Sequence, residues 1–214
     1  MIEIVQAGQA GKTSLLLDMH RLRARVFKHK MKWDVYVTPD DLEVDQFDLP
    51  DTVYLLALNK DKRVIGSWRL LPTSGPTMIR ELWPQYLESL PMPSRRDVWE
   101  VSRFAVDSLL QNPEAAEREM YQTVGAMFCA LTEFCLVTEI REIFTFYDER
   151  IAKVIQRIDC QPHKVSQKIN FDGVPCQVGA FKIDVDMLTR LRAATSITQN
   201  FIGEIELPPA FDRS

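Results

Sequence analysis

Three arginines and a set of carboxylates are the residues of this chain best suited to chemistry. Arg69 and Arg103 are flanked by large apolar residues in the runs SWRLLP and VSRFAV, and Arg23 lies in a run with helical spacing. An arginine in apolar surroundings is rarely buried unless a carboxylate pairs with it. The candidate partners are Glu43, Asp45, Asp48 and Glu100. For any one of these charges taken singly, a solvated surface position is the alternative.

The string GQAGKTS resembles a phosphate-binding P-loop. That motif requires glycine where this chain has Gln6, so the backbone cradle for phosphates is incomplete. A P-loop nucleotide hydrolase therefore remains a minor alternative. The simpler interpretation is that Gly11, Lys12 and Thr13 form a loop that caps the helix after them.

The cysteines and histidines do not have the spacing of a metal site. The cysteines show no CxxC pair, and they are Cys129, Cys135, Cys160 and Cys176. The histidines show no HExxH pair, and they are His20, His29 and His163. We expect buried, reduced thiols and no bound metal.

Composition narrows the class of protein. The 214 residues carry a formal net charge of −4 and are 46% hydrophobic, as in one soluble globular domain. A sequence pI of about 5.5 argues against binding to nucleic acid, which requires a basic surface. The opening segment lacks the pattern of a signal peptide, and no apolar run approaches the roughly 18 residues of a membrane span. We expect a cytoplasmic protein.

The elements that must position the charged residues follow from apolar periodicity. Strands are expected at 2–5, 52–59, 63–72, 97–107 and 142–147. Two hairpins are expected, one joining 52–59 to 63–72 and one over 163–184 that turns at Asp172-Gly173. Helices are expected at 14–29, 78–90 (short and irregular), 113–139, 149–158 and after 184.

These elements predict one α/β domain (α+β) over residues 1–214, with a single mixed, largely antiparallel sheet flanked by helices. The tail from about residue 196 is expected to be loosely ordered. Residues 31–50 form a long acidic loop, and long ordered loops are often functional.

The charged and aromatic residues also match a family in chain order. LRARVFKHKMKW contains Arg23, Phe27 and Trp33, LEVDQFD contains Glu43, Asp45 and Asp48, SWRLLP contains Arg69, and WEVSRFAV contains Glu100 and Arg103. Together these motifs resemble the LuxI-type acyl-homoserine lactone synthases over residues 23–106. Trp83 departs from the pattern, because the family usually has phenylalanine there. Of the tryptophans, Trp68 is better explained as ordinary core.

The resemblance implies a fold similar to the GNAT acyltransferases and a reaction between an acyl thioester and S-adenosylmethionine. The methionyl amine attacks the thioester, and the methionyl carboxylate then displaces methylthioadenosine to close the lactone, a quorum-sensing signal. S-adenosylmethionine and acyl-ACP or acyl-CoA are the substrates, and no tightly bound cofactor is expected. A catalytically silent GNAT-like binding module is the non-enzyme alternative.

The resemblance assigns roles to residues of this chain. An α-amino group has a pKa of about 8, so a base must remove its proton, and Glu100 is the first choice, directly or through a water. A bulge between Glu100 and Arg103 would turn both toward one site and release N–H groups for the tetrahedral oxyanion. The catalytic set is Glu100, Arg103, Arg69, Asp45 and Asp48. The substrate-binding set is Arg23, Phe27, Trp33, Glu43, Trp83, Ser102, Phe104 and Thr145.

The acyl donor must bring a phosphopantetheine arm. No Q/R-x-x-G-x-G/A loop for a pyrophosphate follows VWEVSRFAV. Arg150, Lys153 and Arg157 share one face of the helix at 149–158, which could meet an acidic carrier protein or could simply be solvated. Acyl-carrier protein is therefore favoured over acyl-CoA. Thr145 matches a position that family members use near the 3-position of the acyl chain.

Overall fold

The structure is a computed structural model that describes residues 1–171, 173–201, 203, 208 and 211. The chain forms two compact units. Unit 1 comprises Met1–Arg69, Arg103–Ala130 and Asn200–Ser214, and unit 2 comprises Leu70–Ser102 and Leu131–Gln199. The expectation of a loosely ordered tail falls largely on residues outside those described. Each unit is described by itself below.

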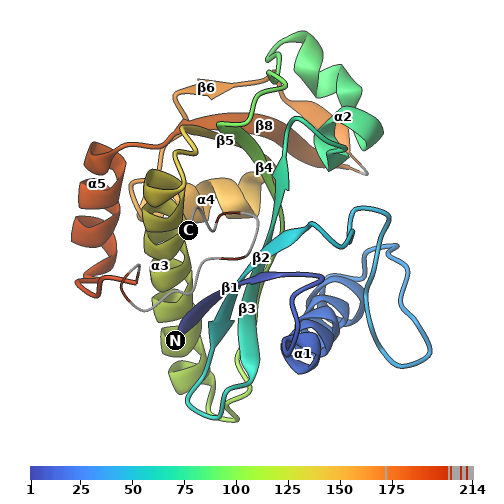
Figure 1. Cartoon of the computed structure of the whole chain (residues 1–214), viewed down its shortest axis with the longest axis vertical. Helices are drawn as coiled ribbons and strands as arrows, with labels where there is room; N and C mark the ends of the chain where they lie inside the picture. The colour runs from blue at the N-terminus through green and yellow to red at the C-terminus, as the bar shows by residue number, and fades with distance from the viewer. Residues whose placement is uncertain (172, 202, 204–207, 209–210, 212–214) are drawn as a thin grey trace. The chain divides into compact units, whose positions relative to one another are not determined.

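In unit 1 the strand order is β1-β2-β3-β4 (Figure 1). β1 (Ile2–Gln6) is antiparallel to β2 (Val53–Leu58), with Ile4 opposite Leu55. The Asn59 N–H donates to the Arg63 carbonyl at 3.0 Å and closes the turn into β3 (Val64–Pro72). The first predicted hairpin is therefore confirmed.

One face of this part of the sheet is covered by α1 (Thr13–Arg23) and by η1 (Ala24–Lys30), which is a π-helix. Met19 and Leu22 of α1 and Phe27 of η1 pack with Tyr54 and Leu56 of β2. The single α-helix expected at 14–29 is thus wrong in its second half, because apolar spacing alone does not distinguish an α-helix from one that widens into a π turn.

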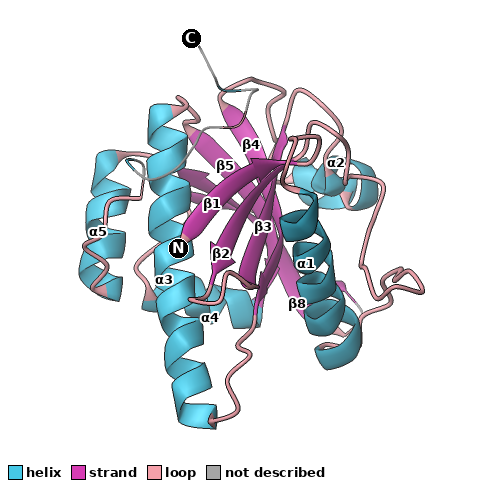
Figure 2. Ribbon diagram, turned by 60° about the horizontal axis from the view of Figure 1, so that its bottom comes forward, coloured by secondary structure: helices cyan, strands magenta, loops and turns pink. Residues whose placement is uncertain are grey.

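The other face is covered by the first part of α3 (Pro113–Val137), so that α1 and α3 lie on opposite sides of the strands of unit 1 (Figure 2). Gly66 of β3 allows this close approach. A Cβ at that position would lie 2.5 Å from the Met127 sulfur and 3.0 Å from the Ala57 Cβ.

β4 (Val98–Val106) contains an irregularity near its middle. The Thr73 N–H donates to the Val98 carbonyl at 3.1 Å, and the Asp107 N–H donates to the Ile65 carbonyl at 2.9 Å. Between these two bonds the β4 side has one residue more than the β3 side. Arg103, within β4, has a left-handed φ of 56°. An extra residue with a kinked backbone marks a β-bulge, which lies where the sequence predicts it.

In unit 2 the strand order is β3-β4-β5-β8-β6, with β7 paired to β8. β5 (Glu142–Asp148) is parallel to β4 and antiparallel to β8 (Val174–Lys182). β6 (Lys164–Val165) and β7 (Ile169–Phe171) are both antiparallel to β8. The predicted second hairpin is present as β7 and β8, with Gly173 at a φ of 82°, whereas Asp172 lies outside the described residues. The mixed, largely antiparallel sheet is confirmed.

The helices of unit 2 follow the predicted order. The irregular helix is two pieces, α2 (Met78–Leu82) and the 3-10 helix η2 (Pro84–Glu88). α4 (Glu149–Arg157) follows β5 directly, and α5 (Val185–Thr195) follows β8. The core of this unit includes Ile79, Tyr86, Val98, Phe144 and Val178.

α3 corrects one expectation. Among the described residues it is the helix long and apolar enough to cross a membrane, with a mean hydropathy of 1.3 over its most apolar window. However, 61% of that window is buried inside the protein, and Met127, Cys129 and Phe134 are fully buried. α3 is therefore a core helix of a soluble protein, with its apolar residues packed inside.

Candidate active site

Three arginines and three carboxylates of unit 1 alternate around a closed ring of ion pairs. In order around the ring they are Arg23, Glu43, Arg103, Asp45, Arg69 and Asp48. Each guanidinium contacts two carboxylates, and each carboxylate contacts two guanidiniums. The three positive and three negative charges of the ring therefore balance, and most of the ring is buried. The predicted pairing of the arginines with the acidic loop is present in the structure.

Asp48 is the most heavily bonded carboxylate of the ring. It accepts two bonds from Arg23, from Nη1 at 2.7 Å and Nη2 at 2.9 Å, and one from Arg69 Nη1 at 3.1 Å. The Tyr54 hydroxyl donates to it at 2.7 Å, and the Asp45 N–H donates at 2.9 Å. Burial raises the pKa of Asp48, but Arg23 and Arg69 outweigh burial and hold that pKa well below its usual range. Asp48 is thus an ionised anchor.

Glu43 joins the ring to α1. Its carboxylate accepts from Arg23 Nε at 2.5 Å and from Arg103 Nε at 3.2 Å. Its backbone is fixed by His20, because the Glu43 N–H donates to the His20 carbonyl at 3.2 Å and the His20 Nδ1 lies 2.7 Å from the Glu43 carbonyl oxygen. A carbonyl only accepts, so Nδ1 donates. Burial, reinforced by Arg23, lowers the pKa of His20 and so favours the neutral imidazole.

The sequence gives no signal for two partners of the ring, because both are aromatic residues in apolar surroundings. Tyr54 lies in the apolar run TVYLLALN and reaches Asp48 with its hydroxyl. Phe47 is buried, and its ring lies 5.5 Å from the guanidinium carbon of Arg69.

Solvent reaches the ring at one edge. The side chains of Arg23, Arg69 and Glu43 are at most 1% exposed, whereas those of Arg103 and Asp45 are 13% and 15% exposed. The two exposed partners are 2.6 Å apart, from Arg103 Nη2 to Asp45 Oδ2. Burial lowers the pKa of Arg103, while Glu43 and Asp45 act in the opposite direction. Arg103 and Asp45 are therefore the least buried members of the ring.

An aromatic pair lies beside this edge. The guanidinium carbon of Arg103 lies 5.7 Å from the centre of the Phe27 ring. Phe27 stacks on Trp33 with ring centres 5.2 Å apart and planes within 4°. The Trp33 N–H donates to the Phe27 carbonyl at 2.9 Å, and Trp33 is 42% exposed. The pair therefore gives the exposed edge an apolar wall.

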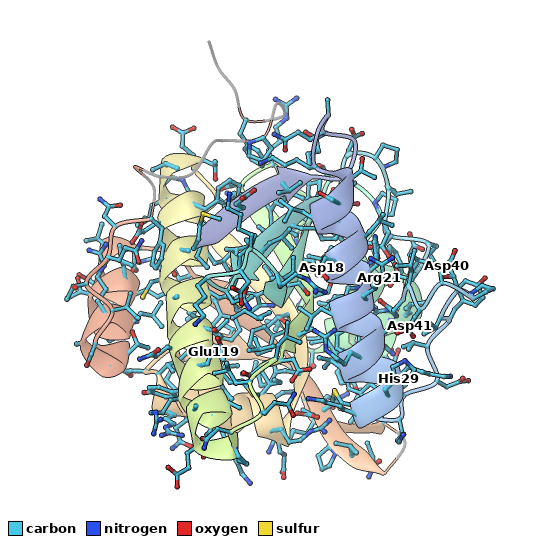
Figure 3. The ribbon with its side chains drawn as sticks, turned by 90° about the horizontal axis from the view of Figure 1, so that it is seen from below. Asp18, Arg21, His29, Asp40, Asp41 and Glu119 are labelled. Carbon is cyan, nitrogen blue, oxygen red and sulfur yellow. The ribbon has the colours of Figure 1, made fainter. Side chains whose placement is uncertain are left out.

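The loop that supplies the ring carboxylates runs beside α1 and η1. Asp40 and Asp41 lie on the side of Arg21 and His29 (Figure 3). The His29 Nε2 lies 2.7 Å from Asp41 Oδ1, and both side chains are about half exposed. An isolated bridge between Val37 and Glu43 closes the loop on itself.

Phe104, expected at the substrate site, contacts the aromatic core of unit 1. Its ring centre lies 4.8 Å from that of Trp68 and 6.1 Å from that of Phe128. Trp68 is 5% exposed and also packs edge-on against Phe128, so its interpretation as core is confirmed. A role for Phe104 at the substrate stays a prediction.

In unit 2, Glu100 holds the start of α2. Its Oε2 accepts the Ile79 N–H at 2.8 Å, and its Oε1 accepts the Met78 N–H at 3.2 Å. Thr77, at the position that usually caps a helix, makes no such bond with its side chain. Glu100 is fully buried. These two bonds give Glu100 a structural task in addition to the predicted catalytic one.

The remaining residues of the predicted substrate-binding set belong to unit 2. Trp83 stacks on Phe146 with ring centres 4.2 Å apart, and Phe171 approaches Trp83 edge-on. Thr145 is half-buried on β5 and lies opposite Gly179 of β8 in the ladder. Ser102 is half-buried on β4. Roles for Trp83, Thr145 and Ser102 stay predictions.

α4 presents a basic surface. Arg150, Lys153 and Arg157 are all exposed, as a docking face requires. Arg150 Nη2 also lies 2.5 Å from Asp148, whose carboxylate caps the start of the helix by accepting the N–H groups of Arg150 and Ile151. One of the three cations is therefore partly neutralised by its own helix cap.

The segment that resembles a P-loop is engaged elsewhere. The Lys12 Nζ donates to Glu3 at 2.9 Å. Lys12 itself occupies the cap position of α1, and no side chain caps that helix, so the expected capping role was wrong in this respect.

The four cysteines are buried thiols, as expected. Within the described part of the chain, no group of three or more His, Cys, Asp or Glu residues is arranged to hold a metal ion.

Comparison with known proteins identifies the family. A family model described as autoinducer synthase matches residues 9–191. The acyl-homoserine-lactone synthase of Rhizobium radiobacter is 37% identical over 146 residues, which cover 68% of this chain and 68% of that protein. The chain belongs to the autoinducer synthase family. It is an acyl-homoserine-lactone synthase, which forms its product from S-adenosylmethionine and an acyl donor with release of methylthioadenosine. The nucleotide hydrolase and the silent binding module are thereby set aside.

Solved structures agree with this fold. The CoA-dependent acyl-homoserine lactone synthase BjaI, solved with SAM and isopentyl-CoA, is 25% identical to this synthase with a TM-score of 0.77, covering 96% of this chain and 92% of that one. FeeM, an N-acyl amino acid synthase from uncultured soil microbes, is 12% identical with a TM-score of 0.51, covering 91% and 98%. The synthase therefore has the GNAT-like acyltransferase fold that the sequence predicts.

Proposed function

We propose that the exposed edge of the ring, Arg103 with Asp45, binds the amino-acid end of S-adenosylmethionine. That end carries a carboxylate next to an ammonium group, which matches a guanidinium next to a carboxylate. The supporting observation is the ring itself, in which Arg103 and Asp45 are the least buried of the six charged side chains. Asp48 and Glu43 then hold the arginines, and Asp45 is the carboxylate that meets the substrate.

The two chemical steps divide among different residues. Glu100 accepts the proton of the amine, directly or through a water, and the amine attacks the thioester carbonyl. The tetrahedral oxyanion that forms requires hydrogen-bond donors, for which the backbone at the bulge around Arg103 is the proposed source, until the thiol leaves. The methionyl carboxylate then attacks the carbon attached to sulfur; a C–O bond forms, a C–S bond breaks, and methylthioadenosine leaves as a neutral thioether.

The second step depends mainly on the shape of the bound chain. Because nucleophile and leaving group belong to one molecule, orientation can supply about 7–11 kcal/mol of the acceleration. The stacked pair Phe27 and Trp33 is the wall that folds the methionyl chain, and its aromatic faces suit a sulfonium cation.

The acyl donor is the finer question. BjaI is described as CoA-dependent, so acyl-CoA serves at least one synthase of this fold. For this chain we favour an acyl-carrier protein, because Arg150, Lys153 and Arg157 present exposed cations to an acidic partner. Thr145 would bond a 3-oxo group, and Trp83, Ser102 and Phe104 stay in the proposed substrate-binding set. Mass spectrometry of the organic extract from expressing cells would name the acyl group.

The same interpretation covers the organisation of the chain. The family model extends over residues 9–191 and so includes most of both units, which supports one synthase domain. The four buried cysteines, all present as thiols, support a reducing compartment, the cytoplasm.

A pairing of enzyme variant with substrate analogue tests the proposed site. Arg103→Met should weaken S-adenosylmethionine binding about 100-fold but change the binding of decarboxylated S-adenosylmethionine little, because the lost contact is to the carboxylate. Asp45→Asn gives a second variant, which should weaken both ligands. Arg95→Met, which breaks an exposed ion pair with Asp97, is the control. Equal losses for both ligands in Arg103→Met would refute the assignment.

A further inference from the structure

A second buried carboxylate of unit 1, outside the ring, contacts both ends of the π-helix η1. Asp107 follows β4 and is 3% exposed. Its Oδ2 accepts Arg25 Nε at 2.8 Å, and its Oδ1 accepts Lys30 Nζ at 2.5 Å. The Met31 N–H donates to the Val26 carbonyl at 2.9 Å, a bond across five residues that is typical of a π turn.

The spacing of the two cations explains why the turn must be a π turn. In an α-helix, residues five apart point about 140° away from each other, since each residue turns by about 100°. Arg25 and Lys30 would then approach one carboxylate from widely different directions. A π turn, closed by bonds from residue i to i+5, brings these two side chains to nearly the same side. The double contact with Asp107 therefore favours the π form over a continued α-helix.

Asp107 itself is rigidly held. Its N–H donates to the Ile65 carbonyl at 2.9 Å, and its Oδ1 accepts the Ser108 N–H at 2.8 Å. The Ser108 hydroxyl in turn bonds to Glu119 of α3, which Figure 3 labels on that helix. Burial raises the pKa of Asp107, but the bonds from Lys30 and Arg25 outweigh it and lower that pKa. The carboxylate is a fixed, ionised anchor for η1.

The clamped turn carries the aromatic wall. Phe27 lies between Arg25 and Lys30 in η1, its ring faces the guanidinium of Arg103, and its carbonyl accepts the Trp33 N–H. If the turn relaxed to an α-helix, every residue after Arg25 would change direction, and the Phe27 ring would leave Arg103.

We propose that Asp107 is a positioning residue of the synthase, which holds η1 in its π form and thereby places Phe27 and Trp33 against the substrate. This inference rests on the proposed role of that pair as a wall of the substrate site. Asp107 acts through η1 and does not contact the substrate.

The test removes the contacts between Asp107 and η1 and uses a second lysine of the same helix as a control. Lys30→Gln and Asp107→Asn remove the clamp, whereas Lys28→Gln removes an exposed ion pair 3.7 Å long with Asp34 and is the matched control. We expect Asp107→Asn to raise KM for S-adenosylmethionine about tenfold with a smaller change in kcat, and to speed amide hydrogen exchange of residues 24–33 but not of the sheet. Lys30→Gln, at a half-exposed position, should do the same more weakly, and it remains informative if Asp107→Asn does not fold.

Three results would overturn the proposal. The first is amide hydrogen exchange of residues 24–33 that stays slow in both Asp107→Asn and Lys30→Gln. The second is exchange that rises over the whole chain while KM for S-adenosylmethionine is unchanged. The third is a Lys28→Gln variant with the same exchange and KM as Lys30→Gln. A parallel Trp33→Ala variant separates the role of the aromatic wall from the role of Asp107 in holding η1. If Trp33→Ala leaves KM unchanged, the wall itself was misassigned; if it raises KM while Asp107→Asn does not, only the clamp was wrong.

Discussion

Replacing Asp48 by asparagine tests whether the ring is held together by its buried charges. Asparagine has the same shape, but its amide nitrogen cannot accept hydrogen bonds. In one orientation that nitrogen would face Arg23, Arg69 and Tyr54, and in the other it would face Arg23 and the Asp45 N–H. Two arginines would also lose a shared counter-ion. Asp48→Asn therefore leaves net positive charge in a buried site.

The expected loss of stability in Asp48→Asn follows from this geometry. Breaking a buried, hydrogen-bonded ion pair by removing one partner costs about 3–5 kcal/mol. For a chain of this length, each kcal/mol lowers Tm by about 2–4 °C, so the variant should melt roughly 6–20 °C lower. Asp34→Asn, at a fully exposed side chain paired loosely with Lys28, should leave Tm nearly unchanged.

The pKa of Asp48 sets the direction in which its contribution to stability changes with pH. The pKa of Asp48 is lower in the folded protein than its value of about 3.9 in the unfolded chain. Its contribution to stability is therefore complete above about pH 5 and is lost as the pH falls below about 4 toward the folded pKa.

Urea unfolding, followed by circular dichroism at pH 7, 5 and 3.5, measures the difference between wild type and Asp48→Asn. That difference should be the same at pH 7 and 5 and smaller at pH 3.5. A loss at pH 7 no greater than that of Asp34→Asn, or a difference that grows on acidification, would refute the view of the ring as a charge-balanced buried unit.

Three further outcomes are expected. Glu100→Gln should lower the acylation rate by about 10²–10⁴, less so as the pH rises toward the amine pKa of about 8, and it should also cost about 1–3 kcal/mol because glutamine leaves one helix N–H unpaired; a pH–rate profile with near-normal turnover at neutral pH would remove Glu100 from catalysis. Thr77→Val should melt no lower than wild type, because the buried hydroxyl has no hydrogen-bond partner among the described residues; a clearly lower Tm in calorimetry would contradict this. The triple change Arg150→Glu, Lys153→Glu and Arg157→Glu should raise KM for acyl-carrier-protein donors about tenfold or more and leave KM for S-adenosylmethionine unchanged; an unaltered donor KM would identify a merely solvated face.

The sequence by itself determined the participants of the ring and the elements that carry them. Arginines placed among tryptophan, leucine, valine and phenylalanine require buried partners, and the acidic loop is the segment that can supply them. Strand alternation and turn residues likewise predicted the two hairpins and the mixed sheet, because these signals are local. The bulge at Arg103 could be anticipated because a regular pleat would separate Glu100 from Arg103.

Only the tertiary structure decided how these residues combine. The fold brings together Arg23, Asp48 and Arg69 from segments that are distant in sequence, and this closes the ring. No local sequence pattern predicts which carboxylate oxygen contacts which guanidinium nitrogen. The bonds from Glu100 to the start of α2 and from Tyr54 to Asp48 likewise join distant segments. The π-helix is the clearest case, since its residues have α-helical spacing and the carboxylate that favours the wider turn, Asp107, lies at the far end of β4.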